Sequence, residues 1–186
     1  MQTRQKVLLQ SIITVFSLLC LLSFFPVSAQ ASKATGYSSH FASRRITYRI
    51  RSTSKTYRNS WTKAIKAWNK LHVISLVPAP AGTQPQISMS TKAKYGEYYG
   101  YPEYFADNYD VSAGMNLYLS RYYVWEWILK SRDRVSLCSN LIGSALGLKD
   151  SKSANSIMNP GPYMPTAPTK TDKKGLQNAY RGVPWN

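Results

Sequence analysis

The sequence is poor in histidine, cysteine and acidic residues, and each shortage excludes a class of protein. Among its 186 residues are two histidines and two cysteines, too few for a disulfide framework or for a metal site built from three imidazoles. Eight Asp and Glu stand against 24 Lys and Arg, so the formal net charge is +16. A chain this basic is expected to attract anionic polymers and surfaces, with an attraction that weakens as salt rises.

The N-terminal residues have the pattern of an export signal. Arg4 and Lys6 precede an apolar run over residues 12–25, after which small residues continue to Ala31. The pattern predicts cleavage after Ala31, with Ala29 as the second choice, and hence a secreted, extracellular protein that can associate with the cell surface. An uncleaved membrane anchor is the alternative, although polar residues leave the run short of about 20 consecutive apolar residues.

Cleavage after residue 31 leaves 186 − 31 = 155 residues, which suffice for one domain with one core. We expect residues 32–45 to form a flexible lead and residues 46–186 to form the domain. This part keeps 22 basic and 8 acidic residues, a net charge of 22 − 8 = +14. It keeps a single cysteine, Cys138, so no internal disulfide can form, and we expect this thiol to be a small buried hydrophobic group.

Hydrophobic periodicity predicts mixed α and β structure. In residues 61–71 an apolar stripe at steps of three and four predicts a helix whose lysines point to solvent. His72 follows this helix and is expected at the surface, not as a metal ligand. The expected strands are residues 46–50, 73–77, 86–91 and 115–118, and the further expected elements are an apolar segment at 122–130 and helices at 135–146 and 171–180.

Basic residues are concentrated in one part of the chain. Residues 32–96 contain twelve Lys and Arg and no acidic residue. We expect a surface here that binds an anionic cell-wall polymer or an anionic membrane; nucleic acid is not expected as a physiological partner. A solvated face that only confers solubility is the alternative. The residues expected to form the surface are Arg49, Arg51, Lys63, Lys66 and Lys70.

Tyrosine is concentrated between residues 95 and 109. This stretch holds six Tyr and one Phe among fifteen residues and is interrupted by Gly96, Gly100 and Pro102, which predicts a loop. One interpretation is an aromatic contact surface, because Tyr offers a large rigid area and a hydroxyl group. The other is that these rings pack together to hold the loop in place.

The remaining signal lies in residues 135–160. Apolar residues at steps of three and four predict a core helix, and Gly147 is expected to end it in a left-handed conformation. A tight turn is predicted at Ser156–Pro160. The letters G-x-A-L-G-L-x-x-S, followed by S-I-M-x-P, resemble the matrixin branch of the metzincin zinc endopeptidases, whose signature is H-E-x-x-H-x-x-G-x-x-H with a later Met-turn.

In that signature three histidines bind zinc and the glutamate acts as the general base. Aligning Gly143, Gly147 and Met158 with the motif leaves every chemical position changed and the structural positions kept. The first His position holds Asn140, the Glu position Leu141, the second His position Ser144 and the third Asp150. The likeness extends to R-I-T-Y-R-I, W-x-x-A-I-x-x-W and P-Q-I-S-M-S earlier in the chain, and to the closing helix at Thr171–Tyr180.

The resemblance implies an α+β, zincin-like domain. It would have a small mixed sheet with two main helices, a central helix followed by the Met-turn at Met158, a C-terminal helix, and a groove along an edge strand. With its four chemical positions changed, the protein is expected to hold no zinc and no other cofactor.

The expected function is that of a non-catalytic pseudopeptidase, a monomer, which binds an anionic envelope polymer, an extended peptide or a related active protease. The alternatives are a zinc metalloendopeptidase, which is the activity of the family, and a residual hydrolase with an unrecognised site. Ser144 as a nucleophile is a further idea, but the sequence places no His or Lys to activate it.

Overall fold

The computed structural model describes residue 36 and residues 40–94, 98–105, 114–126, 129–160 and 165–185, with the side chains of Tyr104 and Glu126 excepted. The chain divides into two units, Met1–Ala31 and Ser32–Asn186. All described residues belong to the second unit. The expected signal peptide at residues 1–31 lies outside the described residues.

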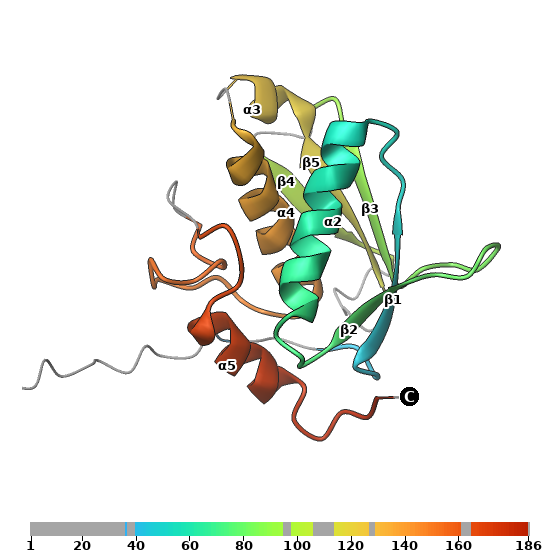
Figure 1. Cartoon of the computed structure of the whole chain (residues 1–186), viewed down its shortest axis with the longest axis vertical. Helices are drawn as coiled ribbons and strands as arrows, with labels where there is room; N and C mark the ends of the chain where they lie inside the picture. Colours follow the sequence, from blue (N-terminus) through green and yellow to red (C-terminus); the bar gives the residue numbers. More distant parts are fainter. Residues whose placement is uncertain are drawn as a thin grey trace, which may run out of the picture. The chain divides into compact units, whose positions relative to one another are not determined.

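The predicted mixture of α and β structure is confirmed. Five strands form one mixed sheet in the order β2-β1-β3-β5-β4 (Figure 1). The first four of these are parallel neighbours, whereas β4 pairs with β5 in the antiparallel sense and forms an edge. The strands are β1 (Arg45–Ile50), β2 (Ser75–Pro78), β3 (Ile87–Lys92), β4 (Gly100–Tyr104) and β5 (Met115–Ser120).

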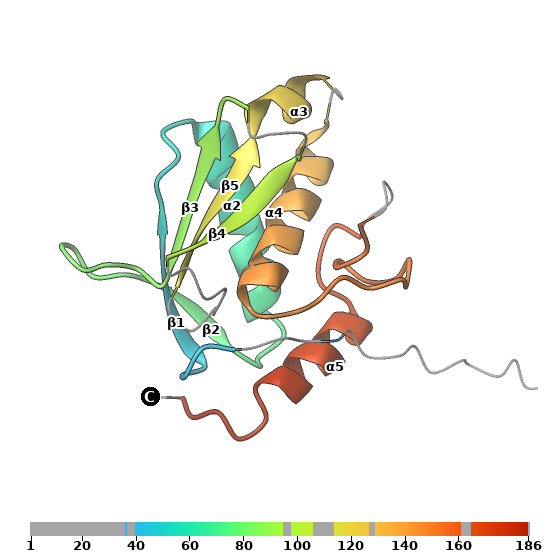
Figure 2. The same ribbon diagram turned by 180° about the vertical axis from the view of Figure 1, so that it is seen from behind.

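Two long helices cover the same face of the sheet. They are α2 (Lys55–Asn69) and α4 (Ser131–Ala145), which lie side by side in front of the strands in Figure 1 and behind them in Figure 2. The indole nitrogen of Trp68 on α2 donates a 2.9 Å hydrogen bond to the Ser139 carbonyl on α4. A short helix, α3 (Arg121–Glu126), follows β5, and α5 (Lys170–Ala179) closes the domain.

The core lies between the helices and the sheet, and strand alternation explains its composition. Successive side chains of a strand point to opposite faces, so one set of alternate residues faces α2 and α4. Most of these residues are buried and apolar, with Tyr48 and Ile50 of β1 partly buried, whereas many of their neighbours in sequence carry polar or charged groups. The buried set includes Ile46 of β1, Ile87 and Met89 of β3, and Met115, Leu117 and Leu119 of β5.

The prediction of a loop throughout residues 95–109 is wrong in its middle, because β4 occupies Gly100–Tyr104. Pro102 lacks an N–H group, but an edge strand tolerates proline when its missing donor is not needed by a neighbour. Gly100 fits because a β-carbon there would lie 2.6 Å from Leu141 and 2.7 Å from the Tyr118 carbonyl. Residues 95–97 and 106–109 of the expected loop lie outside the described residues.

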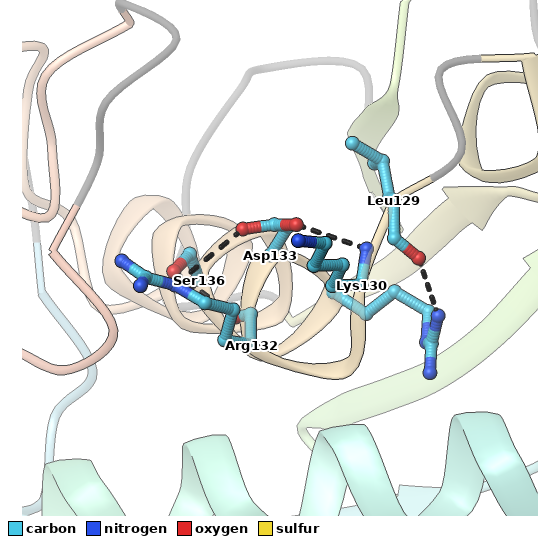
Figure 3. A network of polar contacts seen from close by, with 6 residues as sticks. Leu129, Lys130, Arg132, Asp133 and Ser136 are labelled. Atoms are coloured by element: carbon cyan, nitrogen blue, oxygen red, sulfur yellow. Dashed lines mark hydrogen bonds and ion pairs between the residues drawn. The ribbon is translucent and has the colours of Figure 1, made fainter.

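Local hydrogen bonds define where α4 begins (Figure 3). The Asp133 carboxylate accepts a 2.9 Å hydrogen bond from the backbone N–H of Lys130, which would otherwise lack a partner at the helix start. The Arg134 guanidinium donates a 2.6 Å bond to the Leu129 carbonyl just before the helix. Asp133 also stabilises the N-terminus of α4, because its negative charge lies at the positive end of the helix dipole.

The end of α4 follows the sequence prediction. Gly147 has a φ angle of 88°, in the left-handed region where a side chain would be strained. Its N–H donates to the Ser144 carbonyl at 2.9 Å, and the N–H of Leu148 donates to the Gly143 carbonyl at 3.0 Å. This pair of bonds is the Schellman arrangement, which turns the chain sharply after a helix. Asp150 is thereby carried back beside α4.

The expected lead at residues 32–45 needs correction at its C-terminal end. Phe41 is fully buried, and its N–H lies 3.4 Å from the hydroxyl of Tyr180. The Arg44 guanidinium donates hydrogen bonds of 2.6 and 2.8 Å to the carbonyls of Tyr180 and Val183 after α5. An aromatic ring in the core and a bonded arginine hold this segment against the C-terminal residues, so residues 41–45 belong to the packed domain.

Candidate functional site

The four positions that the resemblance assigns to zinc chemistry lie on α4 and just after it. Asn140, Leu141 and Ser144 belong to the helix, and Asp150 follows it. Residues four apart are neighbours on a helix surface, so Asn140 and Ser144 share one side. The Ser144 hydroxyl donates a 3.4 Å hydrogen bond to the backbone carbonyl of Asn140, so its proton is directed to a group that cannot act as the base of a nucleophile.

The Asn140 side chain is buried and bonded at both ends. Its amide nitrogen donates a 2.9 Å hydrogen bond to the carbonyl of Ile157, in the turn that contains Met158. Its amide oxygen accepts a 3.1 Å bond from the hydroxyl of Tyr99, which precedes β4. Asn140 therefore connects α4 to two other segments of the chain. A group already engaged in this way is poorly suited to act as a metal ligand.

Asp150 and Asn140 come together around Tyr99. Asp150 is exposed, but its carboxylate is close enough to influence the ionisation of the phenol. Burial raises the pKa of Tyr99 above its usual value, and the negative charge of Asp150 raises it further, because a phenolate would face a carboxylate. Tyr99 thus remains a neutral hydrogen-bond donor to Asn140 at ordinary pH.

Leu141, at the position that the resemblance assigns to the catalytic glutamate, belongs to the core. It is 2% exposed, and its side chain packs against the backbone of Gly100 in β4. A leucine neither gives nor takes a proton. The apolar contact between α4 and the edge strand therefore occupies the place where a general base would be needed.

The predicted turn at Ser156–Pro160 packs directly under α4. The N–H of Asn159 donates to the Ser156 carbonyl at 3.1 Å, which closes the turn. Met158 is fully buried. A β-carbon on Gly143 would overlap the Met158 sulfur and lie 2.9 Å from the Trp68 ring, so this glycine is what lets the helix approach both side chains.

A second buried group secures this turn and was missed by the reading of the sequence. The Asp172 carboxylate on α5 is fully buried and accepts bonds of 2.5 Å from the Ser156 hydroxyl and 3.0 Å from the Ile157 N–H. It also accepts a 2.8 Å bond from the N–H of Thr169. The letters T-x-x-D at residues 169–172 are a capping-box pattern and were the available signal.

The donor groups at these positions do not fit a zinc ion. A catalytic zinc needs three protein ligands, commonly imidazoles, whereas the site offers an engaged amide, a serine hydroxyl and one carboxylate. Neither histidine is at the site: His40 lies beside the ring of Tyr180, and His72 is exposed after α2. Within the described ranges, no three His, Cys, Asp or Glu side chains are grouped in a way that would hold a metal.

A basic groove lies on the outer side of α2. Lys63, Lys66 and Lys70 are exposed and line a surface cavity of about 350 Å³ together with Ala67, Leu71, Ala167 and Pro168. We call it the lysine groove. The ion pairs found among the described residues involve Lys92 and Arg132, not these three lysines. Three exposed lysine side chains therefore border one opening in the surface.

The two arginines expected to join these lysines do not lie with them. Arg49 in β1 and Arg51 directly after it alternate with Tyr48 and Ile50, so their side chains point to the sheet face opposite α2. Arg49 donates 2.6 and 2.9 Å bonds to the carbonyls of Pro80 and Thr83, and Arg51 bonds Ser88 at 2.9 Å. The expected five-residue surface is therefore divided, because strand alternation sends one part away from the helix.

Cys138 is buried and free, as expected of a small hydrophobic group, and burial raises the pKa of its thiol well above the usual value.

Among the described helices, none combines the length and the apolar character that crossing a bilayer requires.

No profile of a known protein family matches the chain, and no curated protein is significantly similar to it.

Proposed function

We propose that this protein is a matrixin-like, zincin-type domain that has lost its zinc site and acts by binding. Three features support the family assignment: an antiparallel edge strand on an otherwise parallel sheet, a sharp left-handed turn at Gly147 after α4, and Met158 packed beneath Gly143. The turn at Gly147 and the packing of Met158 beneath Gly143 are structural positions that the motif retains. The positions that would carry chemistry hold Asn140, Leu141, Ser144 and Asp150.

The chemistry of these side chains favours a binding protein over an enzyme. Asn140 is used to connect α4 to the Met158 turn, and Leu141 is part of the core. Zinc-dependent peptide hydrolysis needs ligands for the metal and a base for its water, and neither is supplied here. Metal analysis of the purified protein separates the alternatives: one tightly held zinc per chain would restore the metalloendopeptidase hypothesis.

We infer that the ligand is an anionic polymer of the cell envelope, bound in the lysine groove. The observation that carries this inference is that Lys63 and Lys66 of α2 and Lys70 at its C-terminal end, spaced i, i+3 and i+7, line one cavity. A basic side chain near an anionic surface contributes about 1 kcal/mol. Three together contribute about 3 kcal/mol, which is enough for reversible attachment. The electrostatic attraction falls off within a Debye length of about 8 Å at physiological salt.

Cosedimentation with isolated cell walls tests this inference. The triple variant Lys63→Glu, Lys66→Glu and Lys70→Glu is expected to bind about a hundredfold more weakly than the parent at low salt. A matched variant with three other exposed lysines reversed, Lys149→Glu, Lys152→Glu and Lys174→Glu, changes the net charge equally. It should bind nearly as the parent does. If the two variants lose equal affinity for cell walls, the lysines of the groove act only through the net charge and the groove is not the binding site.

A second ligand class is favoured by the edge strand. Outside β4 no further strand of the described residues pairs with the sheet, and β4 runs beside α4. An extended peptide, including a segment of a related active protease, can add to such an edge through its backbone. Hydrogen exchange of the β4 amides with and without peptide measures this: protection confined to residues 100–104 supports it, and unchanged exchange argues against it.

A further inference from the structure

Aromatic and basic side chains are exposed together at the end of the sheet where α3 lies. Trp125 is 76% exposed and Tyr98 is 62% exposed, which is unusual for side chains of this size. Tyr122 on α3 is exposed as well. With the exposed cations Lys94 and Arg121, these residues form what we call the aromatic tip.

Packing of α3 explains why these side chains share one surface. Val124 is buried and fixes the inner side of the helix, which leaves Arg121, Tyr122 and Trp125 on the outer side. The N–H of Tyr122 donates a 2.9 Å bond to the Ala93 carbonyl, which holds α3 against the segment that carries Lys94. The Lys94 ammonium stands 4.7 Å from the centre of the Tyr122 ring.

Tyr98 lies at the same end of the sheet, in the segment before β4, with its ring beside that of Tyr101. The carbonyl of its neighbour Tyr99 accepts a 2.8 Å bond from the N–H of Ser120, the residue before α3. The aromatic tip is distinct from the lysine groove: α3 lies at one end of the domain, whereas the groove borders Pro168, which precedes α5 at the other end (Figures 1 and 2).

We propose that the aromatic tip docks on an anionic lipid bilayer, with Trp125 entering the interface. Trp and Tyr place an apolar ring in the outer acyl region and a polar group among the headgroups. Lys94 and Arg121 supply contacts for lipid phosphates, and the net charge of 22 − 8 = +14 on residues 32–186 adds long-range attraction. A second copy of the tip is a poor occupant, because it would bring these cations against their own equivalents.

The test uses the chain from Ser32 onward, since residues 32–186 form a unit of their own and the apolar run at residues 12–25 would bind lipid by itself. Vesicles of phosphatidylcholine containing about a third phosphatidylglycerol supply the anionic surface. Cosedimentation of Trp125→Ala should be about tenfold weaker than that of the parent. Trp185→Ala removes another exposed tryptophan, 52% exposed near the C-terminus, and is expected to bind as the parent does.

Charge is tested separately from the aromatic anchor. The variant Lys94→Gln with Arg121→Gln should bind these vesicles about thirtyfold more weakly than the parent, and Lys152→Gln with Lys174→Gln serves as its control.

Insertion of Trp125 is measured with vesicles that carry brominated acyl chains. These should quench the tryptophan fluorescence of the parent and of Trp185→Ala more than that of Trp125→Ala. Because Trp125 is exposed, its removal should leave the melting temperature unchanged.

Three results would overturn the proposal. The first is a parent protein that stays in the supernatant with anionic vesicles at low salt. The second is a Trp125→Ala variant that binds and is quenched like the parent. The third is a parent protein that binds isolated cell walls but not vesicles, together with a Trp125→Ala variant that no longer binds the walls. The lysine-groove triple variant should keep its Trp125-dependent quenching, so the two proposals fail independently.

Discussion

The side-chain amide of Asn140 donates a 2.9 Å hydrogen bond to the carbonyl of Ile157, seventeen residues further along the chain. The same side chain accepts a 3.1 Å bond from Tyr99. Asn140 therefore joins α4, the Met158 turn and the segment before β4. Under the proposed matrixin alignment this is the position of the first histidine, and here it holds a side chain that stabilises the fold.

Replacing Asn140 by alanine is therefore expected to destabilise the protein. The change leaves the buried Ile157 carbonyl and the Tyr99 hydroxyl without their partner, which costs about 1 to 3 kcal/mol of unfolding free energy. Urea unfolding followed by circular dichroism measures the loss. Asn155→Ala, at an exposed position, is the control and should change the stability little. An Asn140→Ala protein as stable as this control would mean that the two bonds contribute nothing.

Gly143→Ala tests the close approach of α4 to the Met158 turn. Alanine is intrinsically better than glycine in a helix by about 1 kcal/mol, so an open site would gain stability. Here the new methyl group overlaps the Met158 sulfur and crowds Trp68, and we expect a net loss of about 1 to 3 kcal/mol.

A double-mutant cycle isolates the contact. In a Met158→Ala background, which removes the sulfur, Gly143→Ala should cost less than it does in the parent. Chemical denaturation of the four proteins gives the coupling energy. Additive effects of the two substitutions would show that Gly143 and Met158 are not in contact.

The elements that could be predicted from the sequence are those whose signals are local. The apolar stripe of α2, the periodicity of α4, the glycine at position 147 and the Ser156–Pro160 turn are each contained within a few residues. The alternation in β1 and β3 is equally short-ranged. Such patterns can be recognised without knowledge of tertiary contacts, because they follow from backbone geometry and from the alternation of apolar and polar residues.

The rest depends on partners far apart in the chain. β4 contains Gly and Pro, and it is a strand because β5 offers a ladder to it. The bond between Tyr99 and Asn140 spans 41 residues, and no local pattern announces it. Arg49 lies within the same basic stretch as Lys63, yet the fold places the two on opposite sides of a sheet. The composition showed how much positive charge there is, and only the structure shows where it is concentrated.

Stability at alkaline pH should depend on Tyr99. Its pKa in the folded protein is raised above the value of about 10 that an unfolded chain shows. A raised pKa means that the neutral phenol contributes stability that is complete below pH 10 and is lost as pH rises through the folded-state pKa. In urea unfolding between about pH 8 and 11, Tyr99→Phe should lose stability less steeply than the parent.

The part of this shift that comes from Asp150 can be measured directly. Asp150→Asn removes the negative charge that disfavours the phenolate, so the pKa of Tyr99 should fall. It should remain above the usual value, because burial is the larger cause. Ultraviolet absorbance of tyrosinate, taken as the difference between each protein and its Tyr99→Phe counterpart, follows this single group. An unchanged titration would show that Asp150 does not lie near Tyr99 in solution.

The proposed loss of a zinc site can be tested by restoring it. Asn140→His and Ser144→His place two imidazoles four residues apart on α4, and Asp150→His adds a third from the segment that returns beside Tyr99. If the helix and the turn keep matrixin geometry, this triple variant should bind zinc at least about a hundredfold more tightly than the parent. Isothermal titration and metal analysis after dialysis give the comparison. A variant with only Asn140→His and Ser144→His should fall between the two.

Restoring the base is expected to conflict with the fold. Leu141 is 2% exposed and packs against Gly100, so Leu141→Glu buries a carboxylate and should destabilise the zinc-free protein by several kcal/mol. Zinc added to the quadruple variant should recover part of this loss, because the metal binds the folded form only and offers the carboxylate a nearby positive charge. Thermal unfolding with and without zinc measures that recovery, and hydrolysis of a peptide substrate measures activity. If the triple-histidine protein binds zinc no better than the parent, then Asn140, Ser144 and Asp150 do not occupy the ligand positions of the matrixin motif.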